Sequence, residues 1–247
     1  MITVQRSDRI VQLAIDAPPV NVLDSAVLNA LSAELARCAK DDGIAAVLLS
    51  GAGRCFSAGA SVEEHKPGQA EAMVMALEGA CTALADLPAP TVAMVHGACL
   101  GGAMELVACC DFVVADPEAS FGQPEIKLAF LPPVACTQLL RLTGRQNAAY
   151  AVLTGESMAA ERAAAMGLVQ EILPQGEWGR IEKIFNRLSV PVLRLTKKAL
   201  RRGAEAYDRQ ALTDIRKLFL QELYELEDVA EGIASFEEKR RPEWKHR

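Results

Sequence analysis

The chain has 247 residues and a mass of 26.5 kDa, and its 26 basic and 32 acidic residues give a formal net charge of −6. Hydrophobic residues make up 51% and charged residues 23%, which is typical of a globular protein with one sizeable core, or one core and an appendage. The acidic balance argues against a broad surface for nucleic acid or membrane, although a local basic patch could still bind an anion.

Two segments bear on export and membranes. The N-terminal segment carries charges at Arg6, Asp8 and Arg9 and has no long apolar run, so we expect no secretory signal. The run from 91 to 110 is long and apolar enough to suggest a membrane span, but Glu105 near its middle and the glycines before it favour a folded core. We therefore expect no membrane association.

The cysteines are odd in number, show no CxxC spacing and mostly lie among Ala, Val and Leu. They are Cys38, Cys55, Cys81, Cys99, Cys109, Cys110 and Cys136. This pattern is typical of reduced core thiols, so we predict a cytoplasmic protein. The alternative is a nucleophilic Cys55, but no histidine partner is evident nearby in the sequence.

The first half of the chain alternates strand and helix signals, which predicts α/β layers. Residues 10–15 alternate like a half-buried strand, and after a Pro-rich break Asp24 or Ser25 is suited to cap a helix that ends near Lys40. In chain order, the further predicted elements are strand 46–51, helix 69–86, strand 91–96 and strand 111–116.

Beyond about residue 134 the pattern becomes helical. Helices are predicted over 134–142, 145–154, 159–166, 176–188 and, with interruptions, 191–237. The stretch 208–237 is amphipathic and needs a partner face, on its own core or on another subunit. We divide the chain into a core over 1–185 and a helical C-terminal region over 186–247.

Two glycine-rich turns follow apolar strands, at Cys55–Ser61 and at His96–Glu105. Glycine permits a close backbone approach, so N–H groups at such turns can point into a cleft. The spacing fits neither GxGxxG nor a P-loop, which argues against a phosphate site. The other use of two converging N–H groups is an oxyanion hole.

Glu105 and Glu125 each lie in an apolar stretch, and a buried carboxylate is costly unless it is partnered or protonated. If Gly102 opens a helix, Glu105 lies in its first turn, near the positive end of the helix dipole. Two such acids can divide acid and base roles, because their pKa values are pushed apart. The alternative is that both are merely satisfied core acids.

Several stretches in order along the chain resemble the enoyl-CoA hydratase/isomerase (crotonase) superfamily. They read FSAGAS, HGACLGGAMELVACCDFVVAD, ASFGQPEIKLAF, TGESMAAERAAAMGLVQEIL and FEEKRRPEW. The resemblance implies an α/β fold, a crotonase-like spiral of ββα repeats with a helical C-terminal region that trimerises. It also implies an acyl-CoA hydratase that adds water to an α,β-unsaturated thioester, and a homotrimer or homohexamer.

The resemblance assigns roles to six residues. The backbone N–H groups of Ala60 and Gly102 match the oxyanion hole for the thioester carbonyl, and Glu105 and Glu125 match the two catalytic glutamates. Phe236 and Lys239 match C-terminal positions that contact the CoA nucleotide, commonly from a neighbouring subunit. CoA is then part of the substrate, and we expect no separate cofactor and no metal, because no cluster has metal-ligand spacing.

The chain departs from the family pattern in two places. Ser61 stands where simple hydratases usually have Asp, and PPVACTQ stands where they read Pro-Gly-x-Gly-Gly-Thr-Gln. Pro133 thus replaces a glycine whose N–H helps to hold the catalytic water, and proline has no N–H. We therefore expect a stiff wall near Glu125 that is poor in donors, with Val134 presenting an apolar face.

SVEEHKP and EKRRPEWK, with PPVACTQ, resemble a narrower group that hydrates cyclohexa-1,5-diene-1-carbonyl-CoA in anaerobic aromatic degradation. By this resemblance the acyl pocket contains Phe130, Leu131, Pro133, Val134 and His65, although a surface position for His65 stays open. The alternatives are a general short-chain enoyl-CoA hydratase, an enoyl-CoA isomerase, and a noncatalytic scaffold or RNA-binding member.

Overall fold

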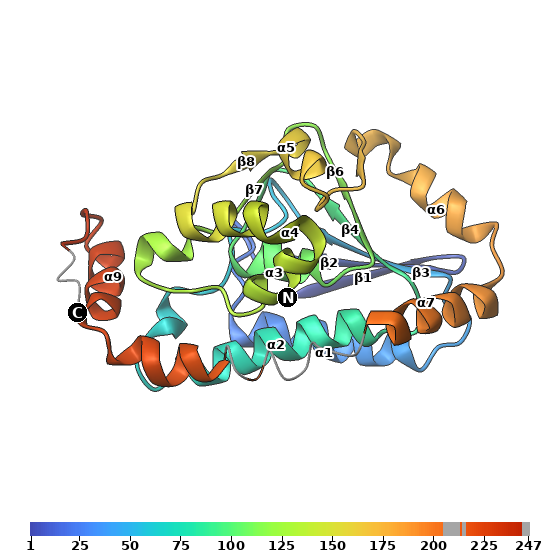
Figure 1. Cartoon of the computed structure of the whole chain (residues 1–247). Coiled ribbons are helices and arrows are strands. Elements are labelled where there is room, and N and C mark those ends of the chain that lie inside the picture. Colours follow the sequence, from blue (N-terminus) through green and yellow to red (C-terminus); the bar gives the residue numbers. More distant parts are fainter. Residues whose placement is uncertain (205–212, 214–215, 244–247) are drawn as a thin grey trace.

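The computed structural model describes residues 1–204, 213 and 216–243, and its larger sheet has the strand order β1-β2-β3-β4-β6-β9 (Figure 1). The strands are β1 (Ile2–Ser7), β2 (Ile10–Ile15), β3 (Ala46–Gly51), β4 (Thr91–Val95), β6 (Phe112–Ala115) and β9 (Glu171–Ile172). β1 pairs antiparallel with β2, and the other neighbours pair in parallel. Parallel strands are covered on both faces, which explains why the apolar strand β4 is buried throughout.

A second, smaller sheet joins β5 (Ala98–Leu100), β7 (Ser120–Gly122) and β8 (Met158–Ala159) in the order β5-β7-β8. β5 pairs in parallel with β7, and β7 pairs antiparallel with β8. The chain enters this sheet directly from β4 and leaves β5 into the helix that carries Glu105. The small sheet therefore places the glycine-rich turn beside the larger sheet.

The helices are α1 (Ser25–Ala39), α2 (Ala70–Asp86), α3 (Gly102–Ala108), α4 (Ala135–Thr154), α5 (Ala160–Ala165), α6 (Gly179–Asn186), α7 (Val190–Ala204) and α9 (Glu227–Glu237). Short turns are η1 (Glu63–His65), η2 (Pro124–Leu128), η3 (Gln175–Glu177), η4 (Leu218–Glu222) and η5 (Leu223–Glu225). α1 and α2 run side by side along one face of the larger sheet (Figure 1). None of these described helices is long and apolar enough to cross a membrane.

Several predicted boundaries are confirmed. Asp24 caps α1, because its carboxylate accepts a hydrogen bond of 2.7 Å from the N–H of Val27. Gly102 opens α3, which is the condition under which Glu105 was expected in the first turn of a helix. The two helices predicted over 134–142 and 145–154 form one element, α4, that is interrupted at Gly144, whose φ of 75° and ψ of 162° are not helical.

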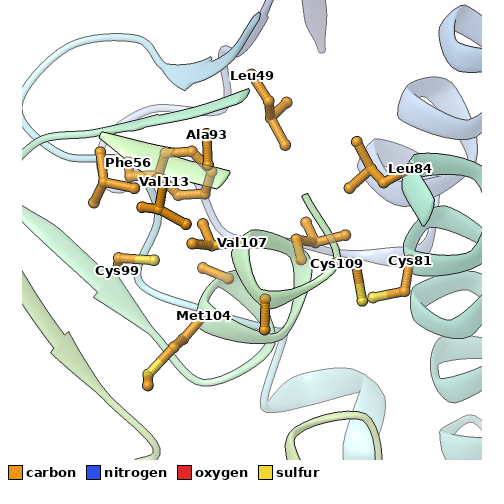
Figure 2. Close-up of a cluster of buried hydrophobic side chains, with 14 of the residues drawn as sticks. Leu49, Phe56, Cys81, Leu84, Ala93, Cys99, Met104, Val107, Cys109 and Val113 are labelled. Carbon is orange, nitrogen blue, oxygen red and sulfur yellow. The ribbon is translucent and has the colours of Figure 1, made fainter. Parts of the chain in front are cut away.

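The core explains why α3 is held firmly. All seven residues of this helix are buried. Figure 2 shows Val107 of α3 between Ala93 and Val113 of the larger sheet and the α2 residues Cys81 and Leu84. Cys38, Cys81, Cys99 and Cys109 take part in this packing, and all seven cysteines are free.

The described part of the C-terminal region is mainly helical, as predicted, and a buried lysine fixes α7 to the core. The side chain of Lys197 is 5% exposed and its Nζ lies 2.6 Å from Oδ2 of Asp111, which also accepts a 2.7 Å hydrogen bond from the N–H of Thr91. Burial lowers the pKa of Lys197 below its ordinary value, and Asp111 opposes this effect.

Part of the amphipathic stretch predicted over 208–237 lies outside the described residues, at 208–212 and 214–215. Before this stretch, α7 exposes large apolar side chains at Val192, Leu195 and Leu200. The trimer or hexamer and the boundary at 185/186 stay predictions.

Candidate active site

The two glycine-rich turns lie side by side because their backbones are hydrogen-bonded to each other. The N–H of Phe56 donates to the carbonyl of His96 over 2.8 Å, and the N–H of Ser57 donates to Ala98 over 3.0 Å. Gly59 lies against the end of β5, with a φ of 104°, and a methyl group there would lie 2.7 Å from the carbonyl oxygen of Leu100. The close approach of the two turns therefore requires glycine at this position.

This approach brings the two predicted oxyanion donors together. A methyl group on Gly102 would lie 3.5 Å from the backbone nitrogen of Ala60, so both N–H groups border the same small volume. Among the described residues, neither N–H donates to another protein group. Gly102 is the first residue of α3, where helical N–H groups have no partner within the helix. The pair can bind one oxygen that carries negative charge.

Glu105 lies in the first turn of α3 and is 2% exposed. Its Oε1 accepts hydrogen bonds from the N–H groups of Val134 and Ala135, over 2.7 and 2.8 Å. These donors are the start of α4, so the carboxylate lies at the positive end of a second helix. Pro133 has no N–H, and the N–H groups of the next two residues donate to Glu105, so the expectation of a wall near Glu125 that is poor in donors stays a prediction.

Glu125 lies in η2, directly after Pro124. It is half-buried, and the room for its carboxylate comes from Gly101, where a methyl group would lie 2.7 Å from Oε1. Gln123 is fully buried beside it; with its amide turned to donate, the nitrogen lies 3.0 and 3.1 Å from the two carboxylate oxygens. The missing side chain of Gly101, whose φ is 54°, thus lets the carboxylate of Glu125 lie against the second glycine-rich turn.

Both carboxyl groups hold their protons more tightly than ordinary side chains. Burial raises the pKa of Glu105 to about 7, although the two α4 N–H groups oppose the rise. Burial also raises the pKa of Glu125 well above its ordinary value, and the nearby charge of Glu105 adds to the effect. Near neutral pH the pair can therefore hold one proton and lack another, which suits general acid–base catalysis.

The raised pKa of Glu105 makes stability depend on pH. Below the unfolded pKa, near 4.5, the folded chain keeps the full benefit of a protonated buried group, and this benefit is lost as pH rises through about 7. Glu105→Gln is always neutral, so we expect its melting temperature to rise relative to that of the native protein between pH 5 and pH 8. Thermal unfolding at both pH values measures this, with exposed Glu118→Gln as the control. If the difference in melting temperature between the variant and the native protein were the same at pH 5 and pH 8, the raised pKa of Glu105 would be contradicted.

The acids and the oxyanion donors border one cavity of about 600 Å³. The predicted residues on its wall are Ala60, His65, Gly102, Glu105, Glu125, Phe130, Leu131, Pro133 and Phe236. The prediction that the side chain of Val134 lines the pocket is corrected, because this side chain is buried away from the wall. Only the backbone of Val134 takes part in the site, through its hydrogen bond to Glu105. Lys239 is exposed in the turn after α9 and is not part of the wall. Its contact with CoA stays a prediction.

His65 faces the cavity and is not a surface residue. It is 8% exposed, and its ring lies 4.7 Å from that of Phe130 and 6.3 Å from that of Phe219. Its Nδ1 lies 2.7 Å from the carbonyl oxygen of Ser61, which can only accept, so Nδ1 carries the proton. Burial lowers the pKa of His65, which keeps the imidazole neutral.

Sequence reasoning missed several wall residues. α2 contributes Met73, Val74 and Leu77, which read in the sequence as an ordinary apolar helix face. Phe219 of η4 closes the cavity from the C-terminal region of the same chain and is 1% exposed. No local pattern links Phe219 to Phe130, because the two are distant in sequence and meet only through the fold. No group of three or more His, Cys, Asp or Glu side chains suited to hold a metal occurs within the described part.

Comparisons with known proteins find similar chains over nearly the whole length. The family model for enoyl-CoA hydratase/isomerase matches residues 5–247. The chain is 32% identical over 246 residues to cyclohexa-1,5-dienecarbonyl-CoA hydratase from Thauera aromatica, covering 98% of this chain and 95% of that one. It is 35% identical over 251 residues to 2,3-dehydroadipyl-CoA hydratase from Escherichia coli, covering 99% and 98%.

The fold agrees as well. A crystal structure of an enoyl-CoA hydratase from Mycobacterium avium subsp. paratuberculosis superposes with a TM-score of 0.87 at 26% identity, covering 99% of this chain and 98% of that one. Together with the paired carboxyls beside two free backbone N–H groups, these matches show that the chain belongs to the enoyl-CoA hydratase/isomerase family.

Proposed function

We propose that this enzyme adds water to the double bond of an α,β-unsaturated acyl-CoA thioester, and that its preferred acyl group is a flat ring, as in cyclohexa-1,5-diene-1-carbonyl-CoA. The observation that carries the first part is the arrangement of Glu105 and Glu125, both with raised pKa values, beside the N–H groups of Ala60 and Gly102. The four groups border one cavity.

The geometry supports a simple sequence of events. The thioester carbonyl oxygen accepts hydrogen bonds from Ala60 and Gly102, and these strengthen as the oxygen gains enolate charge. One ionised carboxylate takes a proton from water while the water oxygen bonds to the β carbon. The protonated carboxyl then gives a proton to the α carbon, which restores the carbonyl. One water is consumed, and the pair ends with the single proton with which it began.

The preference for a ring rests on the aromatic part of the cavity wall. His65, Phe130 and Phe219 form an aromatic cluster there, and aromatic faces pack well against a flat apolar group. The relative from Thauera aromatica carries the name of a cyclic dienoyl-CoA hydratase, whereas the relative from Escherichia coli carries that of an open-chain dehydroadipyl-CoA hydratase. Both relatives are identical to this chain to a similar degree, so sequence identity does not decide between a cyclic and an open-chain acyl group. The aromatic cluster supports the cyclic one.

The test is a panel of linear and cyclic enoyl-CoA thioesters, with products identified by mass. We expect the cyclic dienoyl-CoA to gain one water, and its kcat/KM to exceed that of crotonyl-CoA by at least about tenfold, equal to about 1.4 kcal/mol. Isomerisation would leave the mass unchanged. Crotonyl-CoA as the equal or better substrate would refute the ring preference and leave the hydratase intact. A protein inactive on the whole panel would refute both and favour a noncatalytic member.

A further inference from the structure

The C-terminal helix α9 rests directly on the turn that carries Glu125. The contact is made at Gly232, which is buried. A methyl group at this position would overlap the carbonyl oxygen of Leu128 and lie 2.6 Å from its carbonyl carbon. Leu128 ends η2, three residues after Glu125. The backbones of the helix and the turn thus touch where only glycine fits.

The turn needs such support because its backbone is strained. Ala129, which follows η2, has a φ of 62°, a left-handed conformation that is unfavourable for a residue with a side chain. The N–H of Phe130 returns to the carbonyl of Glu125 over 3.0 Å and closes the turn. A conformation of this kind persists only where the surroundings impose it.

α9 is itself well anchored. Val229 and Ile233 are buried in one apolar cluster with Phe130, at the C-terminal side of the turn. At the end of the helix, Glu237 pairs with Lys66 over 2.7 Å. Figure 1 shows α9 at one end of the molecule, away from the larger sheet, and its residues Phe236 and Glu237 lie on the cavity wall. The helix can therefore act as a fixed support.

We infer that Gly232 is a positioning residue: its missing side chain lets α9 press on the backbone of Leu128 and hold Glu125 at the distance and angle that proton transfer needs. This inference rests on the proposed function, in which Glu125 is one of the two acid–base groups. Helix propensity alone would favour alanine at this position, so the close backbone contact explains the glycine and helix formation does not.

The test is Gly232→Ala, with Gly79→Ala as the matched control. Gly79 lies exposed in α2, and a methyl group there meets no atom within 4 Å. We expect Gly232→Ala to lower kcat on the best enoyl-CoA by at least about tenfold with little change in KM, because small displacements of a catalytic group cost about this much or more. Gly79→Ala should keep native kcat and KM.

A double-mutant cycle separates positioning from a general loss of stability. In a Glu125→Gln background, Gly232→Ala should cost no further kcat, since the group it positions no longer transfers a proton. An equal fractional loss in both backgrounds, or native kcat in Gly232→Ala, would overturn the inference.

A readout without substrate distinguishes this inference from the proposed function. Hydrogen exchange followed by mass spectrometry should show faster exchange in the segment 124–131 for Gly232→Ala than for the native protein or Gly79→Ala. Unchanged exchange there would show that the turn does not depend on Gly232, whatever the substrate proves to be. Faster exchange together with a native protein inactive on every thioester would refute the proposed function, and with it the catalytic role inferred for the contact.

Discussion

Glu105→Gln and Glu125→Gln are each expected to lower kcat by at least about 10²-fold, which is the scale of lost acid–base catalysis. Glutamine has nearly the shape of glutamate, and its carbonyl oxygen can still accept the hydrogen bonds that Val134 and Ala135 give to Glu105. Neither substitution touches the N–H groups of Ala60 and Gly102. The thioester should therefore still bind, and KM should change little.

Steady-state kinetics on the best thioester of the panel measures this effect. Glu118→Gln provides a matched control, because Glu118 is exposed and lies away from the cavity wall. It should retain native turnover. Near-native kcat in either active-site variant would remove that residue from the mechanism. If only one of the two variants loses activity, a single carboxyl performs both proton transfers, as in an isomerase-like mechanism.

Asp111→Asn is expected to lower the free energy of unfolding by about 3 kcal/mol, near the low end for breaking a buried pair. The substitution removes the negative charge that faces the buried ammonium of Lys197 and leaves it with neutral acceptors: the new amide oxygen, the carbonyl of Ala89 at 3.2 Å, and weaker contacts to Leu84 and Thr91 at 3.5 Å. The side chain of Asp111 is 33% exposed, and screening by water reduces the expected loss of stability. The second substitution Lys197→Met removes the stranded charge and should restore most of the loss.

Urea unfolding at one fixed protein concentration tests this prediction, because assembly would otherwise shift the midpoint. Asp41→Asn is the matched control: Asp41 pairs with Arg6 at the surface, where water screens the interaction, so the midpoint should barely move. A double variant less stable than Asp111→Asn alone would show that the lysine stabilises α7 through its remaining contacts and not through the ion pair.

The parts of this fold that were predictable are those with a local cause. Asp24 lies directly before an apolar helix, and its side chain caps that helix. Gly102 opens a short helix with Glu105 one turn later, as the glycine pair indicated. Strands β5, β7 and β8 were missed because they have only two or three residues each, too few for an alternating pattern to show.

The parts that escaped prediction depend on where distant segments meet. Pro133 correctly signalled a missing N–H, but it gave no sign that α4 begins just after it and aims its first N–H groups at Glu105. Phe219 and Gly232 serve the site from the C-terminal region, far in sequence from Phe130 and Leu128. Their roles follow from tertiary packing, which no residue pattern near them encodes.

The hydrogen bonds of Glu105 give its two oxygens different tasks. Both α4 donors bind Oε1, and no described residue donates to Oε2. A proton on Oε1 would compete with those donors, so Oε2 is the oxygen that is free to gain and lose one. The two oxygens of one carboxyl group thus have different roles. Oε1 connects α3 to α4 through its hydrogen bonds, and Oε2 exchanges protons. Turnover can therefore proceed without breaking the hydrogen bonds between α3 and α4.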